Sequence, residues 1–161
     1  MNVLALHNQV TELSARVLRP LEPLLALGTR GYVGWQFVKS GWLKLASWDG
    51  TLYLFREEYR VPLLPPEIAA VSGTTSELLF GALVMLGLAG RLSAAGLFAV
   101  NVIAVVSYSH VLFADGFEAA FAQHVLWGFM LAMLVIHGPG RWSIAGLVDR
   151  LGGSRTGVLR V

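Results

Sequence analysis

The chain has 161 residues, of which 55% are hydrophobic and 14% charged, and it contains no cysteine. A soluble domain carries about 25% charged residues, so the composition indicates a single membrane-embedded domain. The lack of cysteine excludes thiolate nucleophiles, iron–sulfur clusters, cysteine-ligated zinc and covalently attached haem, and a net charge of +2 does not suggest a nucleic-acid partner.

Residues 1–19 predict an amphipathic helix on the membrane surface, because leucine and valine recur on one face from Leu6 to Val17. A docking helix for a cytoplasmic protein is the alternative interpretation. Pro20 and Pro23 should break this helix before the first membrane span. No cleaved signal peptide is predicted.

The first predicted span, residues 24–46, carries positive charges among its apolar residues. On a helical projection, Arg30, Gly34, Gly41 and Lys44 fall within about 40° of one line. The glycines on this line predict close packing against another helix. Lys44 lies near the helix end and should extend to the headgroups, whereas Arg30 lies about 9 Å inside the span and requires a partner.

Three further spans are predicted at residues 67–90, 92–113 and 118–138, each near the length of about 20 residues that a bilayer core requires. The aromatic-rich connection at residues 47–66 should lie at the membrane surface and contain a short helix over residues 51–59. The predicted fold class is therefore all-α: a transmembrane four-helix bundle with short interfacial amphipathic helices.

The predicted organisation has an N-terminal interfacial helix (residues 1–23), a four-span membrane domain (24–140) and a basic C-terminal surface helix and tail (141–161). Positive residues concentrate on the side that would hold both termini, and such residues mark the cytoplasmic side. They are Arg16, Arg19, Arg91, Arg141, Arg150, Arg155 and Arg160, against Lys44, Arg56 and Arg60 on the other side. We therefore predict a multi-pass protein of a bacterial inner membrane with both termini in the cytoplasm.

Glu77 is the acidic residue that lies deep within a predicted apolar span. Because the first two spans are antiparallel, Arg30 is predicted to pair with Glu77, and Asn101 lies at the same depth and could complete the network. Two interpretations remain open. The pair either fixes how the two spans dock or provides a proton-handling carboxylate beside a bound redox molecule.

A second polar cluster is predicted in the outer half of the bundle, from the first, third and fourth spans. Its members are Ser40, Lys44, His110, Gln123, His124 and Trp127. A quinone headgroup fits this set, because its carbonyls accept hydrogen bonds, its flat ring stacks on an indole and it arrives from the bilayer. Axial haem ligation by His110 and His124 is an alternative, as is a set of ordinary interfacial polar residues. No metal site is predicted.

Several short motifs follow one another along the chain. They are Arg30, Gly34-Trp35-Gln36-Phe37, Ser40-Gly41 with Lys44, Leu54-Phe55, Tyr59 with Val61-Pro62 and Leu64-Pro65, Glu77-Leu78, and Leu86-Gly87-Leu88 with Arg91. With these residues the chain resembles the DoxX family of small four-span membrane proteins over about residues 28–140. The resemblance implies a four-helix membrane bundle and a link to quinone-coupled respiration, as a subunit of a thiosulfate:quinone or terminal quinol oxidoreductase, or to membrane redox-stress complexes.

Together, the residues and the resemblance predict a quinone-interacting membrane subunit of a respiratory or redox-stress oxidoreductase, with a protein partner at its cytoplasmic face. The alternative is a non-catalytic scaffold that anchors a soluble partner through residues 1–19 and 141–161. A small-molecule carrier is disfavoured, because the four spans show no inverted repeat. The sequence leaves open whether the chain is itself an enzyme, which substrate is used and whether an oligomer forms.

Overall fold

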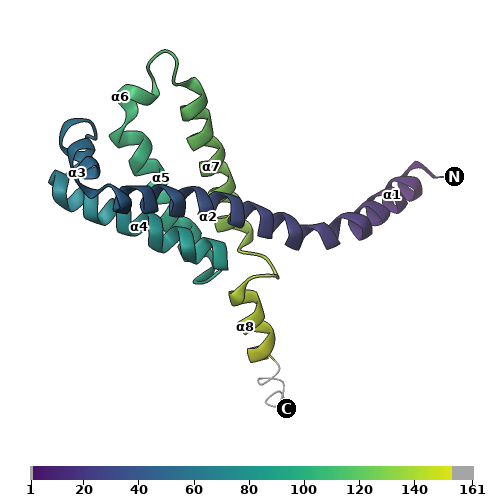
Figure 1. Cartoon of the computed structure of the whole chain (residues 1–161). Coiled ribbons are helices and arrows are strands. Elements are labelled where there is room, and N and C mark those ends of the chain that lie inside the picture. Colours follow the sequence, from purple (N-terminus) through teal and green to yellow (C-terminus); the bar gives the residue numbers. More distant parts are fainter. Residues whose placement is uncertain (1, 154–161) are drawn as a thin grey trace.

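The computed structural model describes residues 2–153, apart from the side chains of Ala5 and Asp149, and every regular element in that part of the chain is helical. The predicted all-α fold is confirmed. The tail residues Arg155 and Arg160, counted above for orientation, lie outside the described residues. In chain order the helices are α1 (Val3–Leu18), the 3-10 helix η1 (Arg19–Leu21), α2 (Glu22–Ala46), α3 (Trp48–Glu57), α4 (Pro66–Leu86), α5 (Gly90–Ser107), α6 (Ser109–Leu112), α7 (Glu118–His137) and α8 (Ile144–Gly153) (Figure 1).

Helix α1, the turn η1 and α2 form one long N-terminal arm (Figure 1). Asn2 caps α1 by accepting a hydrogen bond from the Leu4 amide at 3.4 Å. The α-helix is interrupted at the prolines as predicted, because α1 ends at Leu18 and α2 begins at Glu22, but the 3-10 turn η1 between them keeps the two helices nearly in line (Figure 1). Pro20 lies within η1 and Pro23 in the first turn of α2, where the missing amide donor costs nothing. As a result α1 continues the line of α2 away from the bundle.

The first helical pair is α2 with α4, and α3 packs across them near their connection (Figure 1). The predicted surface helix over residues 51–59 exists but begins earlier, at Trp48, directly after α2. Phe55 of α3 is buried against Ala70 of α4. Pro66 occupies the first position of α4, which favours a helix start. The loop helix is therefore fixed to the bundle by its own small core.

The second helical pair is α5 with α7, which pack on each other and on the first pair. The predicted third span over residues 92–113 is shorter than expected, because α5 ends at Ser107 and the four-residue helix α6 follows. The main core lies where the two pairs meet. Its buried members are Val33, Phe37, Val84, Ala94, Leu97, Leu131 and Leu134.

Within the described part of the chain, three helices are long and apolar enough to cross a membrane: α4, α5 and α7. Helix α2 has 25 residues and sufficient length, but Arg30, Lys39 and Lys44 lower its hydropathy. Its place beside α4 is therefore secured by packing and pairing rather than by apolar composition. Large apolar side chains such as Leu79 and Phe129 remain exposed on the outer surfaces of the bundle, as lipid-facing residues would. The chain is a multi-pass membrane protein.

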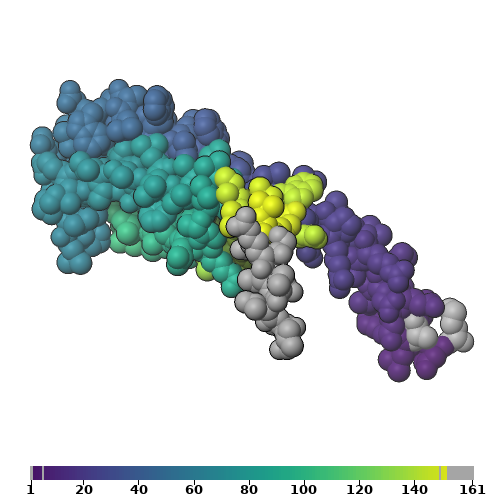
Figure 2. All heavy atoms as spheres, turned by 90° about the horizontal axis from the view of Figure 1, so that it is seen from below, coloured from purple at the N-terminus to yellow at the C-terminus, as the bar shows by residue number. Residues whose placement is uncertain are grey.

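The start of α2 and the C-terminal helix α8 lie at the same end of the bundle. Figure 2 shows α8, in yellow, against the indigo segment where η1 joins α2. The Ala145 amide donates to the Gly87 carbonyl at 3.2 Å, which ties α8 to the end of α4. Gly87 closes α4 with a left-handed backbone (φ 66°), and Ser143 caps α8 by accepting from the Gly146 amide at 3.0 Å.

Candidate functional site

A close contact between α2 and α4 positions the candidate site. A methyl group on Gly34 would lie 2.8 Å from the Gly81 carbonyl oxygen, and one on Gly81 would lie 3.0 Å from the Gly34 oxygen. Gly41 is equally confined, because a methyl group there would lie 2.8 Å from the side chain of Leu78. The packing line predicted along α2 is thus confirmed. The two backbones are close enough for short polar bridges between the helices.

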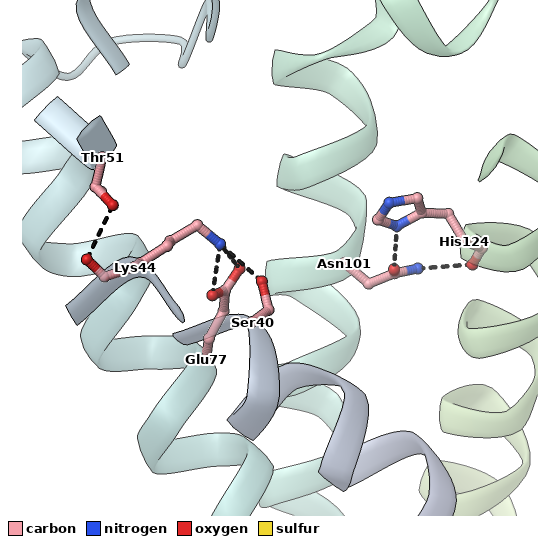
Figure 3. A network of polar contacts seen from close by, with 6 residues as sticks. All are labelled: Ser40, Lys44, Thr51, Glu77, Asn101 and His124. Atoms are coloured by element: carbon pink, nitrogen blue, oxygen red, sulfur yellow. Dashed lines mark hydrogen bonds and ion pairs between the residues drawn. The ribbon is translucent and has the colours of Figure 1, made fainter. Parts of the chain in front are cut away.

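Lys44 and Glu77 form an ion pair at the edge of this contact (Figure 3). The Lys44 Nζ lies 2.7 Å from each carboxylate oxygen of Glu77 and donates to Ser40 Oγ at 2.9 Å. The side chain of Lys44 is 15% exposed and that of Glu77 is 10% exposed. The Thr51 hydroxyl donates to the Lys44 carbonyl at 2.9 Å, so α3 fixes the end of α2. Two predictions are wrong here: Glu77 does not pair with Arg30, and Lys44 turns inward to a carboxylate instead of extending to the headgroups.

Arg30 occupies a separate position near the other end of α2. It is 3% exposed, and its Nη2 donates to the carbonyl oxygen of Trp142. Its guanidinium lies against Gly87 at the C-terminal end of α4, where the helix dipole favours a cation. Arg30 Nε and Nη1 have no hydrogen-bond partner among the described residues. The predicted partner Glu77 is out of reach, because it lies level with Lys44, about 21 Å of helix beyond Arg30.

Asn101 connects α5 to α7 (Figure 3). Contrary to the prediction, it does not contact Glu77. Its Nδ2 donates to the His124 carbonyl at 3.0 Å, and its Oδ1 lies 2.8 Å from His124 Nδ1. Because the amide oxygen can only accept, His124 Nδ1 must carry the proton. In the neutral ring, Nε2 is then the unprotonated nitrogen and a hydrogen-bond acceptor. Asn101 thus fixes both the position and the tautomer of this histidine.

Trp127 packs between the histidine and the core of the bundle. Its indole meets the His124 ring edge-on at a centroid distance of 4.9 Å and the Phe37 ring at 5.6 Å. Its Nε1 is a buried donor with no hydrogen-bond partner among the described residues. A buried N–H without a partner is rare in folded proteins, so this donor requires an explanation. It lies one helical turn from a histidine that presents a free acceptor.

His110 and Gln123 of the predicted cluster lie apart from this group. His110 is exposed on α6, and its ring contacts Tyr108 at 5.7 Å. Gln123 is exposed on α7. Within the described part of the chain, no hydrogen bond or ring contact joins His110 to His124, the pair considered as haem ligands. The structure thus gathers Ser40 and Lys44 around Glu77, and His124 and Trp127 beside Asn101.

An aromatic contact at the α3 end of the bundle was missed by the sequence reasoning. The Tyr108 hydroxyl donates to the Glu58 carboxylate at 2.9 Å, and the Tyr59 and Tyr108 rings meet edge-on at 4.9 Å. Burial raises the pKa of both phenols, and nearby carboxylates, led by Glu58 for Tyr108, raise it further. The aromatic content of this loop indicated a membrane-surface position, but not that the loop would fold back onto the end of α5.

Two surface hollows stand out, and neither is lined by the residues predicted to hold a quinone. One, of about 460 Å³, lies between η1 and the start of α8 and is lined mainly by arginine. The other, of about 590 Å³, follows α4 from Glu67 to Ser76. Neither of these two hollows therefore opens beside Lys44 and His124.

A comparison with protein-family models matches residues 25–110 to the family described as DoxX. No curated protein and no solved structure matches the chain. The matched segment runs from α2 into α6 and includes the glycine contact, Arg30, the Lys44–Glu77 pair and Asn101, whereas His124 and Trp127 lie beyond it. Because the match covers more than half of the chain and the bundle has the expected helical build, the protein belongs to the DoxX family.

Proposed function

We propose that this protein is a quinone-interacting membrane subunit of an oxidoreductase, with a partner protein that carries the redox centre. The observation that carries the proposal is that two rings in contact, Trp127 and His124, offer one hydrogen-bond donor and one hydrogen-bond acceptor to a ligand. Trp127 Nε1 is buried and has no hydrogen-bond partner in the part of the chain that the structure describes, and His124 Nε2 is left as an acceptor by the bond from Nδ1 to Asn101. A quinone/quinol headgroup uses both kinds of partner, because its oxygen accepts in the oxidised form and donates in the reduced form.

The chemistry available to these side chains is proton transfer. In the proposed site His124 Nε2 accepts the proton of a quinol hydroxyl, and the Trp127 N–H donates to the oxygen that becomes a carbonyl. Oxidation of the quinol releases two protons and two electrons: one proton passes to His124 Nε2, the other passes to water at the membrane surface, and both electrons pass to the redox centre of the partner protein. Asn101 acts as a positioning residue, because it holds the ring in the tautomer that can accept.

The ion pair on α2 and α4 fits an uncharged ligand. Lys44 and Glu77 neutralise each other at 2.7 Å, so this ion pair adds no net charge to the interior of the bundle (Figure 3). A neutral headgroup entering from the bilayer would meet hydrogen-bonding groups without a field that favours an ion. Within this proposal Lys44 and Ser40 form the polar wall opposite the histidine.

The quinone content of the protein purified in mild detergent tests this proposal. Trp127→Phe keeps an aromatic ring and removes the N–H, and Trp42→Phe, on an exposed face, is its matched control. The loss of one buried hydrogen bond worth about 1–1.5 kcal/mol should lower quinone retention roughly tenfold. His124→Ala should lower it further, whereas His110→Ala should not. Equal, negligible quinone in the wild type and all variants would overturn the proposal.

We also place the protein in the inner membrane with both termini in the cytoplasm. The excess of arginine at the end that holds η1 and α8 supports this orientation. Reporter fusions after residue 161 and within residues 58–65 test it. We expect a cytoplasmic signal from the first and a periplasmic signal from the second, and the reversed pattern would invert the topology.

A non-catalytic scaffold is the second candidate, and α1 is the observation that favours it. This helix projects from the bundle, and Val10, Leu13 and Val17 on its apolar face are 58%, 64% and 61% exposed. Such a face suits a partner helix or the membrane surface. Deletion of residues 2–18 that releases a co-purifying protein, in a chain that never retains quinone, would favour the scaffold.

A further inference from the structure

Four arginine side chains surround the hollow of about 460 Å³ at the end of the bundle where η1 meets α8. They come from two segments far apart in the sequence, which the fold brings together (Figure 2). The residues that line it are Arg16, Arg19, Pro20, Pro23, Arg141, Trp142 and Arg150. This hollow shares no lining residue with the proposed quinone site.

Carboxylates do not neutralise this cluster among the residues whose side chains are described. No acidic residue with a described side chain lines the hollow. Arg16 approaches Glu12 at 3.9 Å, but both side chains are largely exposed, and such pairs contribute little. No hydrogen bond or ion pair within the described part of the chain occupies the guanidinium groups of Arg19 and Arg141. Four like charges around one hollow repel each other unless an anion lies between them.

The Arg150 side chain is fixed in the wall of the hollow by hydrogen bonds to backbone carbonyl groups. Its Nε donates to the Gly146 carbonyl at 3.2 Å, and its Nη2 donates to the Arg141 carbonyl. Just inside the bundle, Arg30 donates to the carbonyl of Trp142, a residue that lines the hollow. The Arg30 guanidinium is thus a further cation next to the hollow, and it has no carboxylate partner in the described part of the chain.

The surroundings of the hollow indicate that its ligand carries apolar chains. Pro23 lies in the first turn of α2, and the next two residues, Leu24 and Leu25, are 53% and 68% exposed. The exposed Trp142 side chain is of the kind that lies at headgroup depth. A guanidinium fork matches two oxygens of a phosphate, and basic pockets at the ends of membrane helices suit anionic headgroups.

We propose that the hollow binds the phosphate headgroup of an anionic phospholipid, with Arg19 and Arg141 as the principal ligands and the acyl chains along the start of α2. A single bound lipid would neutralise charge contributed by η1 and by the α7–α8 connection, and would hold these two segments together. This inference does not depend on quinone binding, so either proposal can fail without the other.

The test uses the full chain in detergent with phosphatidylglycerol or with phosphatidylcholine of identical acyl chains. Bound lipid is counted by native mass spectrometry, and unfolding is followed by heating. We expect retention of phosphatidylglycerol and a raised melting temperature, with little effect of phosphatidylcholine. Arg19→Gln and Arg141→Gln should each lower phosphatidylglycerol retention about fivefold, as an interaction of about 1 kcal/mol per arginine implies. Arg60→Gln, an exposed arginine outside the hollow, is the charge-matched control.

The sign of the stability change separates a built site from general attraction. With phosphatidylcholine alone, Arg19→Gln and Arg141→Gln relieve repulsion and should leave the melting temperature unchanged or higher. With phosphatidylglycerol the same variants should lower it. Equal retention of the two lipids, or an equal effect of Arg60→Gln, would overturn the proposal. Displacement of the lipid by millimolar glycerol 3-phosphate would assign the hollow to a soluble phosphate and overturn the lipid assignment.

Discussion

Removal of the Glu77 carboxylate should destabilise the bundle strongly, because it leaves the Lys44 ammonium partly buried without a counter-charge. Glu77→Gln keeps the size of the side chain and most of the packing on α2. The loss of one partner from a buried ion pair costs about 3–5 kcal/mol. Since 15% of the Lys44 side chain is exposed and Ser40 still accepts one bond, we expect the lower part of that range, about 3 kcal/mol.

Removal of both charges should cost much less than removal of one. In Lys44→Met/Glu77→Gln no charge is stranded, and apolar replacements of buried pairs are often nearly neutral. A double-mutant cycle should therefore give a coupling free energy of at least about 2 kcal/mol. Each single variant and the double variant are compared with the wild type in the same detergent.

Arg56 and Glu67 provide the matched control, because their ion pair joins α3 to α4 with similar geometry at an exposed place. Arg56 Nη2 lies 2.8 Å from Glu67 Oε1, but the side chains are 52% and 53% exposed. Glu67→Gln should therefore cost much less than Glu77→Gln, because solvent screens an exposed ion pair. The assay is reversible unfolding in mixtures of mild detergent and dodecyl sulfate, followed by far-UV circular dichroism. If Glu77→Gln costs no more than Glu67→Gln, the assignment of a buried, structure-determining pair is refuted.

Three further predictions follow from contacts described above. Gly34→Ala should destabilise the bundle by about 1–3 kcal/mol, because its methyl group would lie 2.5 Å from a side chain of α4. Gly28→Ala, which has nothing within 4 Å of the added methyl group, should be neutral or stabilising. Equal effects of the two substitutions in thermal unfolding would contradict the close contact between α2 and α4. Gly87→Ala and Gly90→Ala both place alanine at positive φ, at a cost of about 1 kcal/mol, but Gly87→Ala also meets a buried arginine and should melt at the lower temperature. The pKa of Tyr108 is raised above its usual value near 10, so its contribution to stability is complete below pH 10 and is lost as the pH rises through the folded-state pKa. Tyr108→Phe should therefore reduce the loss of stability at alkaline pH. Phenolate absorbance and the helical circular dichroism signal, both followed against pH, test this, and an unchanged loss of stability in Tyr108→Phe would contradict the reasoning.

The helical pattern along α2 could be predicted because its residues differ sharply around the helix. Glycines and cations recur at the spacing of one face, and that face is the one that α4 covers. Which cation meets Glu77 could not be predicted, because it depends on how far the two helices are offset along their axes. Each residue of offset moves a side chain by about 1.5 Å along the helix axis.

The partners of Asn101 and His124 could not be predicted for a different reason. Helices α5 and α7 are apolar on nearly all sides, so hydropathy does not define their rotation. The sequence assigned Asn101 to the network of Glu77 and assigned His124 to the outer cluster, and a rotation of one residue, about 100°, would have turned either side chain toward lipid. The separation of His110 from His124 has a similar origin: α5 ends at Ser107, and the following short helix carries His110 onto the exposed surface.

The pairing of Lys44 with a residue that comes 33 positions later has a consequence for how the protein enters the membrane. Helix α2 leaves the ribosome before α4, and its cations make it a poor substrate for insertion on its own, in contrast to α4, α5 and α7. The Lys44 ammonium can pair with the Glu77 carboxylate only after residue 77 has been synthesised. Integration of α2 should therefore wait for α4, and the two helices should enter the bilayer as a hairpin. A nascent chain that ends within the loop before Pro66 would leave its first span at the membrane surface.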